Sequence, residues 1–174
     1  CTVVIKPASE TPLSALAMAE LAAQAGFPKG VINIVPSTAS SDIGKALTSH
    51  PAVRKISFTG STAVGKKLIA QSADNVQKVT MELGGNAPFI VFDDANLEKA
   101  TDMGIAAKFR NNGQVCIAPS KFYIQESKKK DFINLFIEKT KKLKIGNGID
   151  SDVQLGPLTT QKRLNEIEEL VEKT

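Results

Sequence analysis

Short apolar segments alternate with helical segments along the chain, and this alternation is the feature that most restricts the fold. Strand-like runs cover residues 2–5, 31–35, 55–60, 78–83, 88–92 and 121–125. Helical signals cover residues 12–24, 42–48, 62–72, 96–109 and 128–143, and begin again near 160. Apolar strands joined through helices are typical of parallel sheets that are covered on both faces. The chain is therefore predicted to have an α/β fold.

Turn and cap signals support this alternation. Thr11 and Pro12 provide a helix start, and Gly26 with Pro28 beyond it provides the matching stop. The segment GGNAP at residues 84–88 interrupts the rhythm of the elements. We expect a domain boundary there, with one domain over residues 1–84 and a second over residues 85–174.

Composition excludes several classes of protein. The 174 residues are 42% apolar, which predicts a folded chain with a sizeable core. The net charge is +4, and neither half of the chain is strongly basic. The lysines near residues 127–131 and 139–144 alternate with Phe132, Phe136 and Leu143 at helical spacing, which predicts a solvated helix face and no nucleic-acid partner.

No apolar run approaches the roughly 20 residues of a membrane helix, so no membrane association is expected. Cys1 and Cys116 lie in very different contexts, which argues against a disulfide framework and predicts a cytoplasmic location. The chain opens on the strand-like CTVVIKP without a methionine, so it is expected to be a piece of a longer polypeptide.

Cys116 is the first candidate for chemistry, because it lies in the polar loop FRNNGQVC rather than in an apolar run. A free thiol has a pKa of about 8.5, so a nucleophilic cysteine needs neighbours that favour its thiolate. Backbone N–H groups near Gly113 could provide this help and could also stabilise an oxyanion. The alternative is a small core residue without a chemical role.

Glu82 lies 34 positions upstream in TMELGG, where it is the only carboxylate between Asp74 and Asp93. Desolvation by apolar neighbours would make this glutamate a competent general base. The alternative is a strand-end glutamate that pairs with a lysine. Gly84 and Gly85 predict a sharp turn or a close backbone approach.

Two further segments suit a phosphate group. In FTGSTAVG, Gly60 ends a strand and Gly65 lies in the opening turn of a helix, whose free N–H groups favour an anion. Lys6 and Ser9 follow the first strand, at the end where open parallel sheets bind ligands. A purely structural turn with a helix cap explains FTGSTAVG about as well.

Arg110 ends the helix that precedes Cys116, so it either pairs with the helix dipole or holds a substrate carboxylate. His50 is the only histidine and has no metal-ligand spacing around it, so no metal site is expected.

Together, the segments KPAS, FTGSTAVG, MELGGNAP and NNGQVCIAP resemble the aldehyde dehydrogenase superfamily in order and spacing. The segments MELGGNAPFIVFDDA and KFRNNGQVC are most similar to succinate-semialdehyde dehydrogenases. The resemblance covers the whole chain. It implies part of a Rossmann-like coenzyme-binding domain, followed by part of an α/β catalytic domain.

The resemblance also implies roles for individual residues. Cys116 would be the nucleophile that forms a thiohemiacetal and a thioester, Glu82 the base for hydrolysis, and Arg110 the group that holds the substrate's carboxylate. The implied coenzyme-binding residues are Lys6, Ser9, Thr59, Gly60, Ser61, Gly65 and Leu83. The implied partner is a small aldehyde, favoured to be a short semialdehyde acid such as succinate semialdehyde. The implied parent enzyme is a homo-oligomer.

Ser9 stands where NAD-preferring relatives often carry a glutamate, which would repel the 2′-phosphate of NADP. The resemblance therefore implies NADP as the coenzyme, with NAD as the alternative. Members of the superfamily are far longer, so residues 1–174 alone are expected to have little or no dehydrogenase activity. The alternative function is a non-catalytic nucleotide-binding module.

Overall fold

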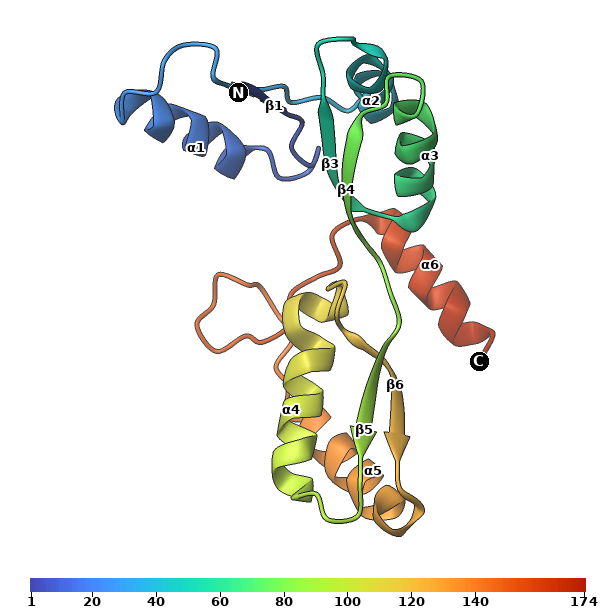
Figure 1. Ribbon diagram of the computed structural model, residues 1–174. Helices are drawn as coiled ribbons and strands as arrows, with labels where there is room; N and C mark the ends of the chain where they lie inside the picture. Colours follow the sequence, from blue (N-terminus) through green and yellow to red (C-terminus); the bar gives the residue numbers. More distant parts are fainter. The chain divides into compact units, whose positions relative to one another are not determined.

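The computed structural model describes residues 1–174, which divide into two compact units, Cys1–Leu83 (unit 1) and Gly84–Thr174 (unit 2). Figure 1 shows the chain coloured from its N-terminus to its C-terminus. The division falls at the start of the GGNAP segment. The assignment of coenzyme binding to one unit and catalysis to the other stays a prediction.

Unit 1 contains two pairs of parallel strands. The elements are β1 (Val3–Ile5), α1 (Leu13–Gln24), β2 (Ile32–Ile34), α2 (Ser40–Ser49), β3 (Lys55–Gly60), α3 (Thr62–Ser72) and β4 (Lys78–Leu83). Strand β1 pairs with β2, and β3 pairs with β4. Helix α3 packs on the second pair, beside which it runs in Figure 1.

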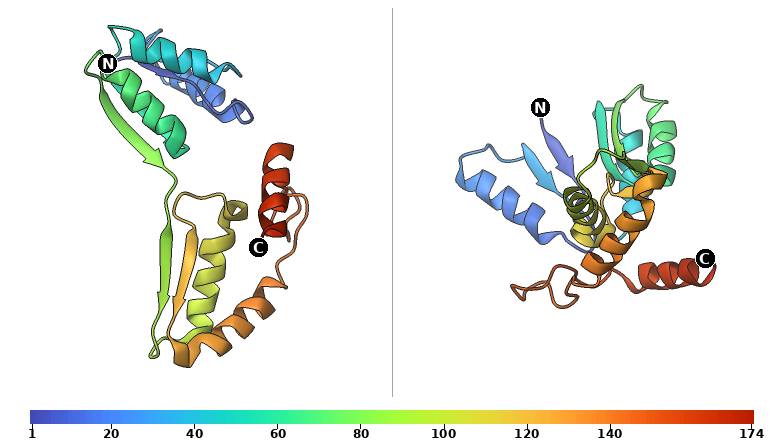
Figure 2. Two further views of the ribbon diagram at one scale, coloured as in Figure 1. Left: turned by 90° about the vertical axis from the view of Figure 1, so that its right-hand side faces the viewer. Right: turned by 90° about the horizontal axis from the view of Figure 1, so that it is seen from below.

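Unit 2 contains one further parallel pair with two helices on the same face. Its elements are β5 (Ala87–Val91), α4 (Leu97–Phe109), the 3-10 turn η1 (Arg110–Gly113), β6 (Pro119–Ile124), α5 (Glu126–Thr140) and α6 (Gln161–Glu172). Strand β5 pairs with β6, and α4 packs against α5 and β6 (Figures 1 and 2).

An aromatic cluster joins the strands of unit 2 to its helices. The ring centroids of Phe89 and Phe122 lie 5.2 Å apart, and those of Phe122 and Phe136 lie 5.4 Å apart. Gly104 of α4 is buried above these rings, and a Cβ atom there would lie 3.3 Å from Phe122. A glycine at this position therefore lets the helix backbone approach the strands closely.

Helix α5 has the amphipathic character that its sequence predicts. Phe132 is buried, whereas the side chain of Lys129 is exposed. Lys139 lies at the edge of this exposed face and forms ion pairs of 2.5 Å with both Glu98 and Asp102 of α4. Hydrogen bonds to these two carboxylates, first to Asp102 and then to Glu98, raise the pKa of Lys139. The prediction of a solvated lysine face over buried phenylalanine is confirmed.

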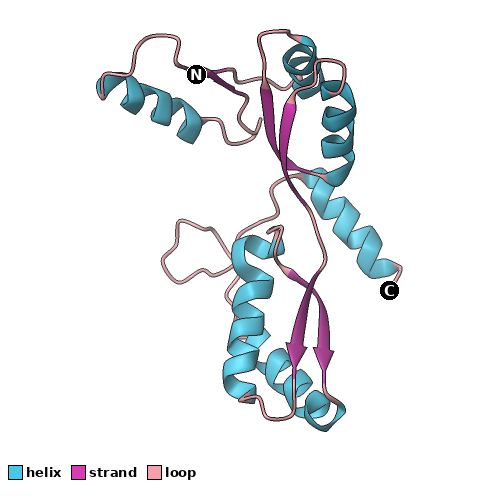
Figure 3. Cartoon of the chain, in the orientation of Figure 1, coloured by secondary structure: helices cyan, strands magenta, loops and turns pink.

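The α/β class with parallel pairing is confirmed, but three sequence-based expectations are wrong. The strands form three separate two-stranded sheets rather than larger sheets covered on both faces (Figure 3). Only Ile56, Val91, Ile105 and Phe132 are buried among the large apolar residues, so the expected sizeable core is absent. A two-stranded sheet covers too little surface to bury the apolar residues on every helix.

The third error concerns the start of α1. Pro12 occupies the N-cap position, and no side chain caps this helix, so Thr11 does not have its expected role. The expected stop is confirmed, because Gly26 has a φ of +87°. None of the helices combines the length and apolar character that crossing a bilayer requires.

Candidate active site

The strand–helix turn of unit 1 (residues 58–65) has the geometry of a capped helix start. Ser61 is the N-cap of α3, and its hydroxyl accepts a 3.4 Å hydrogen bond from the backbone N–H of Val64. Free N–H groups and the positive end of the helix dipole lie at such a start. Of the residues predicted to bind phosphate, Ser61 therefore caps the helix and Gly65 lies just inside it, whereas Gly60 ends β3.

Gly65 and Leu83 come together beside this turn. Gly65 is buried, and a Cβ atom there would lie only 2.7 Å from the Leu83 side chain. Strand pairing places Gly60 opposite Leu83, and Thr59 opposite Glu82. Five of the predicted coenzyme residues therefore gather at the end of the β3–β4 pair; they are Thr59, Gly60, Ser61, Gly65 and Leu83.

Lys6 and Ser9 form a second polar group, beyond the end of β1. The Lys6 ammonium donates to the Ser9 hydroxyl oxygen at 3.4 Å and to the Pro7 carbonyl at 2.9 Å. The Ser9 hydroxyl in turn donates to the Ser37 carbonyl at 3.0 Å. Lys6 makes no ion pair, so its charge remains available to a ligand.

Glu82 lies near the end of β4, and its side chain is exposed. The expectation that apolar neighbours desolvate this carboxylate is therefore wrong for unit 1, because a strand of a two-stranded sheet has one uncovered face. Glu82 also makes no salt bridge, so the alternative of a pair with lysine is not observed.

Gly84 and Gly85 do not have the conformations that their sequence predicts. Neither has a positive φ, and a Cβ atom at Gly84 would meet nothing within 4 Å. At Gly85, a Cβ atom would lie 4.0 Å from the carbonyl oxygen of Cys116, an ordinary contact. The expected need for glycine is therefore wrong here, although Gly85 does lie beside the cysteine.

Cys116 lies in a loop (residues 110–118), here called the nucleophile loop after the role that the sequence predicts for this cysteine, where it is exposed and free. Within the loop, the N–H of Ala118 donates to the carbonyl of Val115 at 3.0 Å. The backbone N–H groups of Cys116 and Ile117 donate to no protein acceptor. Exposure excludes the role of a core cysteine, and the free donors suit an oxyanion.

Arg110 begins the same loop, directly after helix α4. Its side chain is exposed and makes no ion pair or hydrogen bond with the protein. The guanidinium fork is therefore free to bind a carboxylate.

Sequence reasoning missed the side chain that holds this loop, Asn112. Its amide accepts a 3.0 Å bond from the N–H of Gly156 and donates a 2.9 Å bond to the carbonyl of Pro157. The available signal was the run Asn-Asn-Gly, because these residue types tolerate left-handed backbone. Its partners, more than 40 positions away, could not be recognised from that run.

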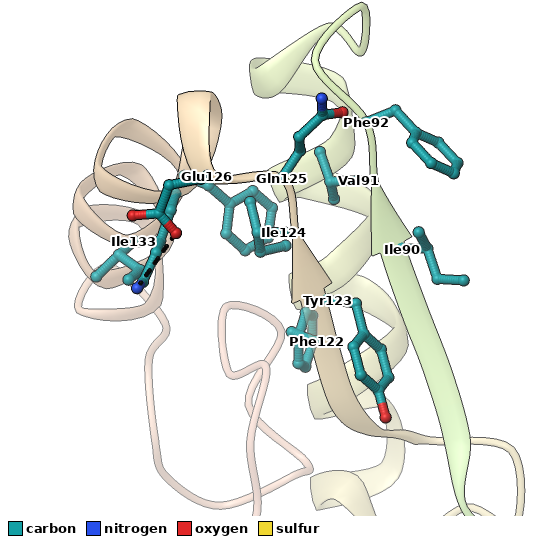
Figure 4. A pocket seen from close by; sticks show the side chains of 11 residues that line it. Ile90, Val91, Phe92, Phe122, Tyr123, Ile124, Gln125, Glu126 and Ile133 are labelled. Atoms are coloured by element: carbon teal, nitrogen blue, oxygen red, sulfur yellow. Dashed lines mark ion pairs between the residues drawn. The ribbon is translucent and has the colours of Figure 1, made fainter.

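A hollow beside β5 and β6 is separate from all of the predicted site residues of unit 2. Figure 4 shows Ile90, Phe92 and Tyr123 at this hollow, together with Glu126, which pairs with Lys129 at 3.7 Å. Its lining is mainly apolar and contains no cysteine, serine or threonine. No group of three or more His, Cys, Asp or Glu side chains could hold a metal ion.

Comparison with known proteins identifies the family. The sequence model of the aldehyde dehydrogenase family matches residues 1–174. This chain belongs to the aldehyde dehydrogenase family. The fold agrees, since the chain superposes with a TM-score of 0.95 on betaine aldehyde dehydrogenase from Staphylococcus aureus, which was solved with NAD+. The two sequences are 38% identical, and the match covers 99% of this chain and 34% of that one.

Semialdehyde dehydrogenases are among the similar relatives. The NADP(+) succinate-semialdehyde dehydrogenase GabD of Escherichia coli K12 is 51% identical over 97% of this chain and 35% of its own length. The glutarate-semialdehyde dehydrogenase of Pseudomonas aeruginosa is 49% identical over 97% of this chain and 35% of its own length. The chain thus spans about a third of the relatives that it matches.

Proposed function

We propose that the complete protein containing this chain is an NAD(P)-dependent aldehyde dehydrogenase that oxidises a short semialdehyde acid, such as succinate semialdehyde. The observation that carries this proposal is the nucleophile loop of unit 2. It combines an exposed thiol, free backbone N–H groups and, at its start, the unpaired guanidinium of Arg110. Relatives about 50% identical that are named as semialdehyde dehydrogenases support the same function.

In this proposal, Cys116 performs covalent catalysis. Its thiolate attacks the aldehyde carbon, so that a C–S bond forms and the carbonyl electron pair moves to oxygen. The free N–H groups of Cys116 and Ile117 are the candidate donors to this oxyanion. The thiohemiacetal becomes a thioester when its carbon loses a hydride. The nicotinamide coenzyme, when bound, would supply the acceptor for that hydride.

Glu82 acts in the hydrolytic half of the reaction. Its carboxylate takes a proton from water as the water oxygen bonds to the thioester carbon. The C–S bond then breaks, which releases the carboxylic acid and regenerates the Cys116 thiolate. The exposed carboxylate of Glu82 has no ion-pair partner, so it is free to accept that proton.

Residues of unit 1 are suited to nicotinamide adenine dinucleotide phosphate (NADP). The Ser61-capped start of α3 suits a pyrophosphate, and Lys6 offers an unpaired ammonium beside the Ser9 hydroxyl. A cation and a hydroxyl at this place favour a ribose 2′-phosphate, whereas a glutamate would repel it. We therefore propose NADP as the preferred coenzyme, with NAD as a possible second one.

The free arginine favours an acidic aldehyde as the substrate. The relatives include enzymes named for succinate semialdehyde, glutarate semialdehyde and 3-sulfolactaldehyde, each of which carries an anionic group. Arg110 would bind that group in this protein.

Several wider expectations belong to the same proposal. Unit 1 would be part of the coenzyme-binding domain and unit 2 part of the catalytic domain of a cytoplasmic homo-oligomer. A polypeptide of residues 1–174 alone would have little or no activity, because it spans only about a third of the relatives' length.

Replacement of the nucleophile tests this function. In the complete protein, Cys116→Ala should lower aldehyde-dependent NADPH formation by at least about a thousandfold. Coenzyme binding, measured by fluorescence titration, should survive in the same variant. The matched control is Cys1→Ala, which removes the other exposed cysteine and should leave the rate unchanged. Undiminished turnover in Cys116→Ala would overturn the proposal.

A further inference from the structure

The nucleophile loop has a backbone that needs outside support. Asn111, Asn112 and Gly113 have consecutive φ angles of 50°, 56° and 74°. Asparagine tolerates left-handed backbone as a single residue, but a run of such residues is unusual and persists where the surrounding structure holds it. Something other than local preference must therefore keep this loop in shape.

The side chain of Asn112 provides a two-point attachment for the loop. Its Oδ1 accepts from the N–H of Gly156 at 3.0 Å, and its Nδ2 donates to the carbonyl of Pro157 at 2.9 Å. A backbone N–H can only donate and a carbonyl can only accept, so these partners fix the orientation of the amide. The segment that receives the loop lies 44 and 45 positions further along the chain.

That segment is itself held by backbone hydrogen bonds, so Asn112 attaches the loop to an ordered part of the chain. The N–H groups of Gln154 and Leu155 both donate to the carbonyl of Lys144, at 3.0 and 3.1 Å. The N–H of Gly146 donates back to the carbonyl of Leu155 at 2.9 Å. The loop is thereby connected through Asn112 to the chain that follows helix α5.

Asn111 provides an internal contrast. It has the same left-handed backbone, but its amide donates only to the carbonyl of Gln114 at 3.2 Å, within the loop itself. Of these two adjacent asparagines with similar backbone, only Asn112 makes a long-range attachment.

We propose that Asn112 is a positioning residue for catalysis, which fixes the loop carrying Cys116 to the segment at Gly156 and Pro157. Its side chain does not touch the reacting atoms. It holds the backbone so that the thiol and the free N–H groups of Cys116 and Ile117 keep one arrangement. This inference rests on the proposed role of Cys116 as the nucleophile.

The test compares Asn112→Gly with Asn111→Gly in the complete protein. Glycine accepts the left-handed conformation at both sites, so each variant removes a side chain without imposing backbone strain. Two quantities are measured: kcat and KM for aldehyde oxidation, and the rate at which iodoacetamide alkylates Cys116, followed over a pH series on the Cys116 peptide by mass spectrometry.

We expect Asn112→Gly to lower kcat on the order of tenfold or more, since small misplacements of reacting groups are costly. The KM for coenzyme should stay unchanged, while the pH profile of Cys116 alkylation shifts. Asn111→Gly should change kcat and the profile much less. Equal effects of the two variants on both quantities would overturn the proposal.

Two further arms keep the result interpretable. If Asn112→Gly does not fold, as judged by circular dichroism, the variant Asn112→Asp replaces it. Aspartate keeps the size of the side chain and the oxygen that accepts from Gly156, but it lacks the N–H group that donates to Pro157. We expect the same changes in that variant, and a wild-type kcat and profile would overturn the proposal. If the complete protein oxidises no aldehyde, the proposed function fails, whereas the alkylation profiles still decide the role of Asn112.

Discussion

The strand–helix turn of unit 1 and the nucleophile loop of unit 2 are built in opposite ways. The turn is held by neighbours in sequence, with Ser61 capping its own helix through Val64. The loop is held from a distance, with Asn112 bonded to Gly156 and Pro157. No residue of the turn has a positive φ, whereas the loop contains three consecutive residues with positive φ.

This difference matches what each region has to do in the proposed function. A phosphate is held by N–H groups that every helix start provides, so local geometry is sufficient. A nucleophile must keep a particular position relative to its oxyanion donors, which ordinary secondary structure does not supply. The comparison therefore predicts that changes to the loop affect kcat, and that changes to unit 1 affect coenzyme use or stability.

Among the residues proposed to bind the substrate or the coenzyme, the largest effect is expected at Arg110, at the start of the loop. Arg110→Ala in the complete protein should lower kcat/KM for succinate semialdehyde roughly tenfold to a hundredfold, because a charge-assisted hydrogen bond is lost. An uncharged aldehyde of similar length should be affected far less. Steady-state kinetics with both substrates gives the ratio.

The control for this prediction is Arg54→Ala, which removes an exposed arginine from unit 1. It should leave both substrates unaffected. Equal losses for the charged and the uncharged aldehyde in Arg110→Ala would show that Arg110 supports the loop rather than the substrate.

A smaller effect is expected at Ser9, where unit 1 is proposed to meet the coenzyme. Ser9→Glu should shift the NADP-to-NAD ratio of kcat/KM towards NAD by about tenfold, since a carboxylate repels the 2′-phosphate. Ser9→Gln has the same shape without the charge and should shift the ratio much less. A ratio that is unmoved by Ser9→Glu would remove Ser9 from the coenzyme site.

The smallest effect tests packing beside the turn. Gly65→Ala places a Cβ atom within 2.7 Å of Leu83, so we expect unfolding free energy to fall by about 1–2 kcal/mol. Gly44→Ala, in the neighbouring helix α2, makes only an ordinary 3.4 Å contact and should be neutral or stabilising. Urea denaturation gives the unfolding free energy of both variants. Equal values would mean that the Leu83 side chain can move away from the added Cβ atom without loss of stability.

Local sequence signals predicted the parts of the molecule that local interactions determine. The bounds of β3, α3 and β4 agree with the predicted segments 55–60, 62–72 and 78–83. The apolar strands and the Ser61 cap specify these elements within a few residues of chain. The polar pair of Lys6 and Ser9 was also predictable, because both residues follow the same short strand.

Features that depend on distant residues were missed or wrong. Apolar strand sequence predicts a buried strand, yet the partners that would extend each two-stranded sheet are not specified by that strand. The same holds for Glu82, whose expected apolar surroundings are not formed by unit 1. The attachment of Asn112 depends on a pairing across more than 40 residues, which no local pattern encodes.

The most direct test of the central claim, that Cys116 is the covalent nucleophile, uses a protein that cannot complete hydrolysis. Glu82→Gln in the complete protein should form NADPH in a burst of one equivalent per subunit and then stall. Peptide mass spectrometry should then find the acyl group of succinate semialdehyde on Cys116. The control variant Glu20→Gln should turn over normally and should not accumulate an acyl group on Cys116. Steady turnover in Glu82→Gln, with no acyl group on Cys116, would contradict the account.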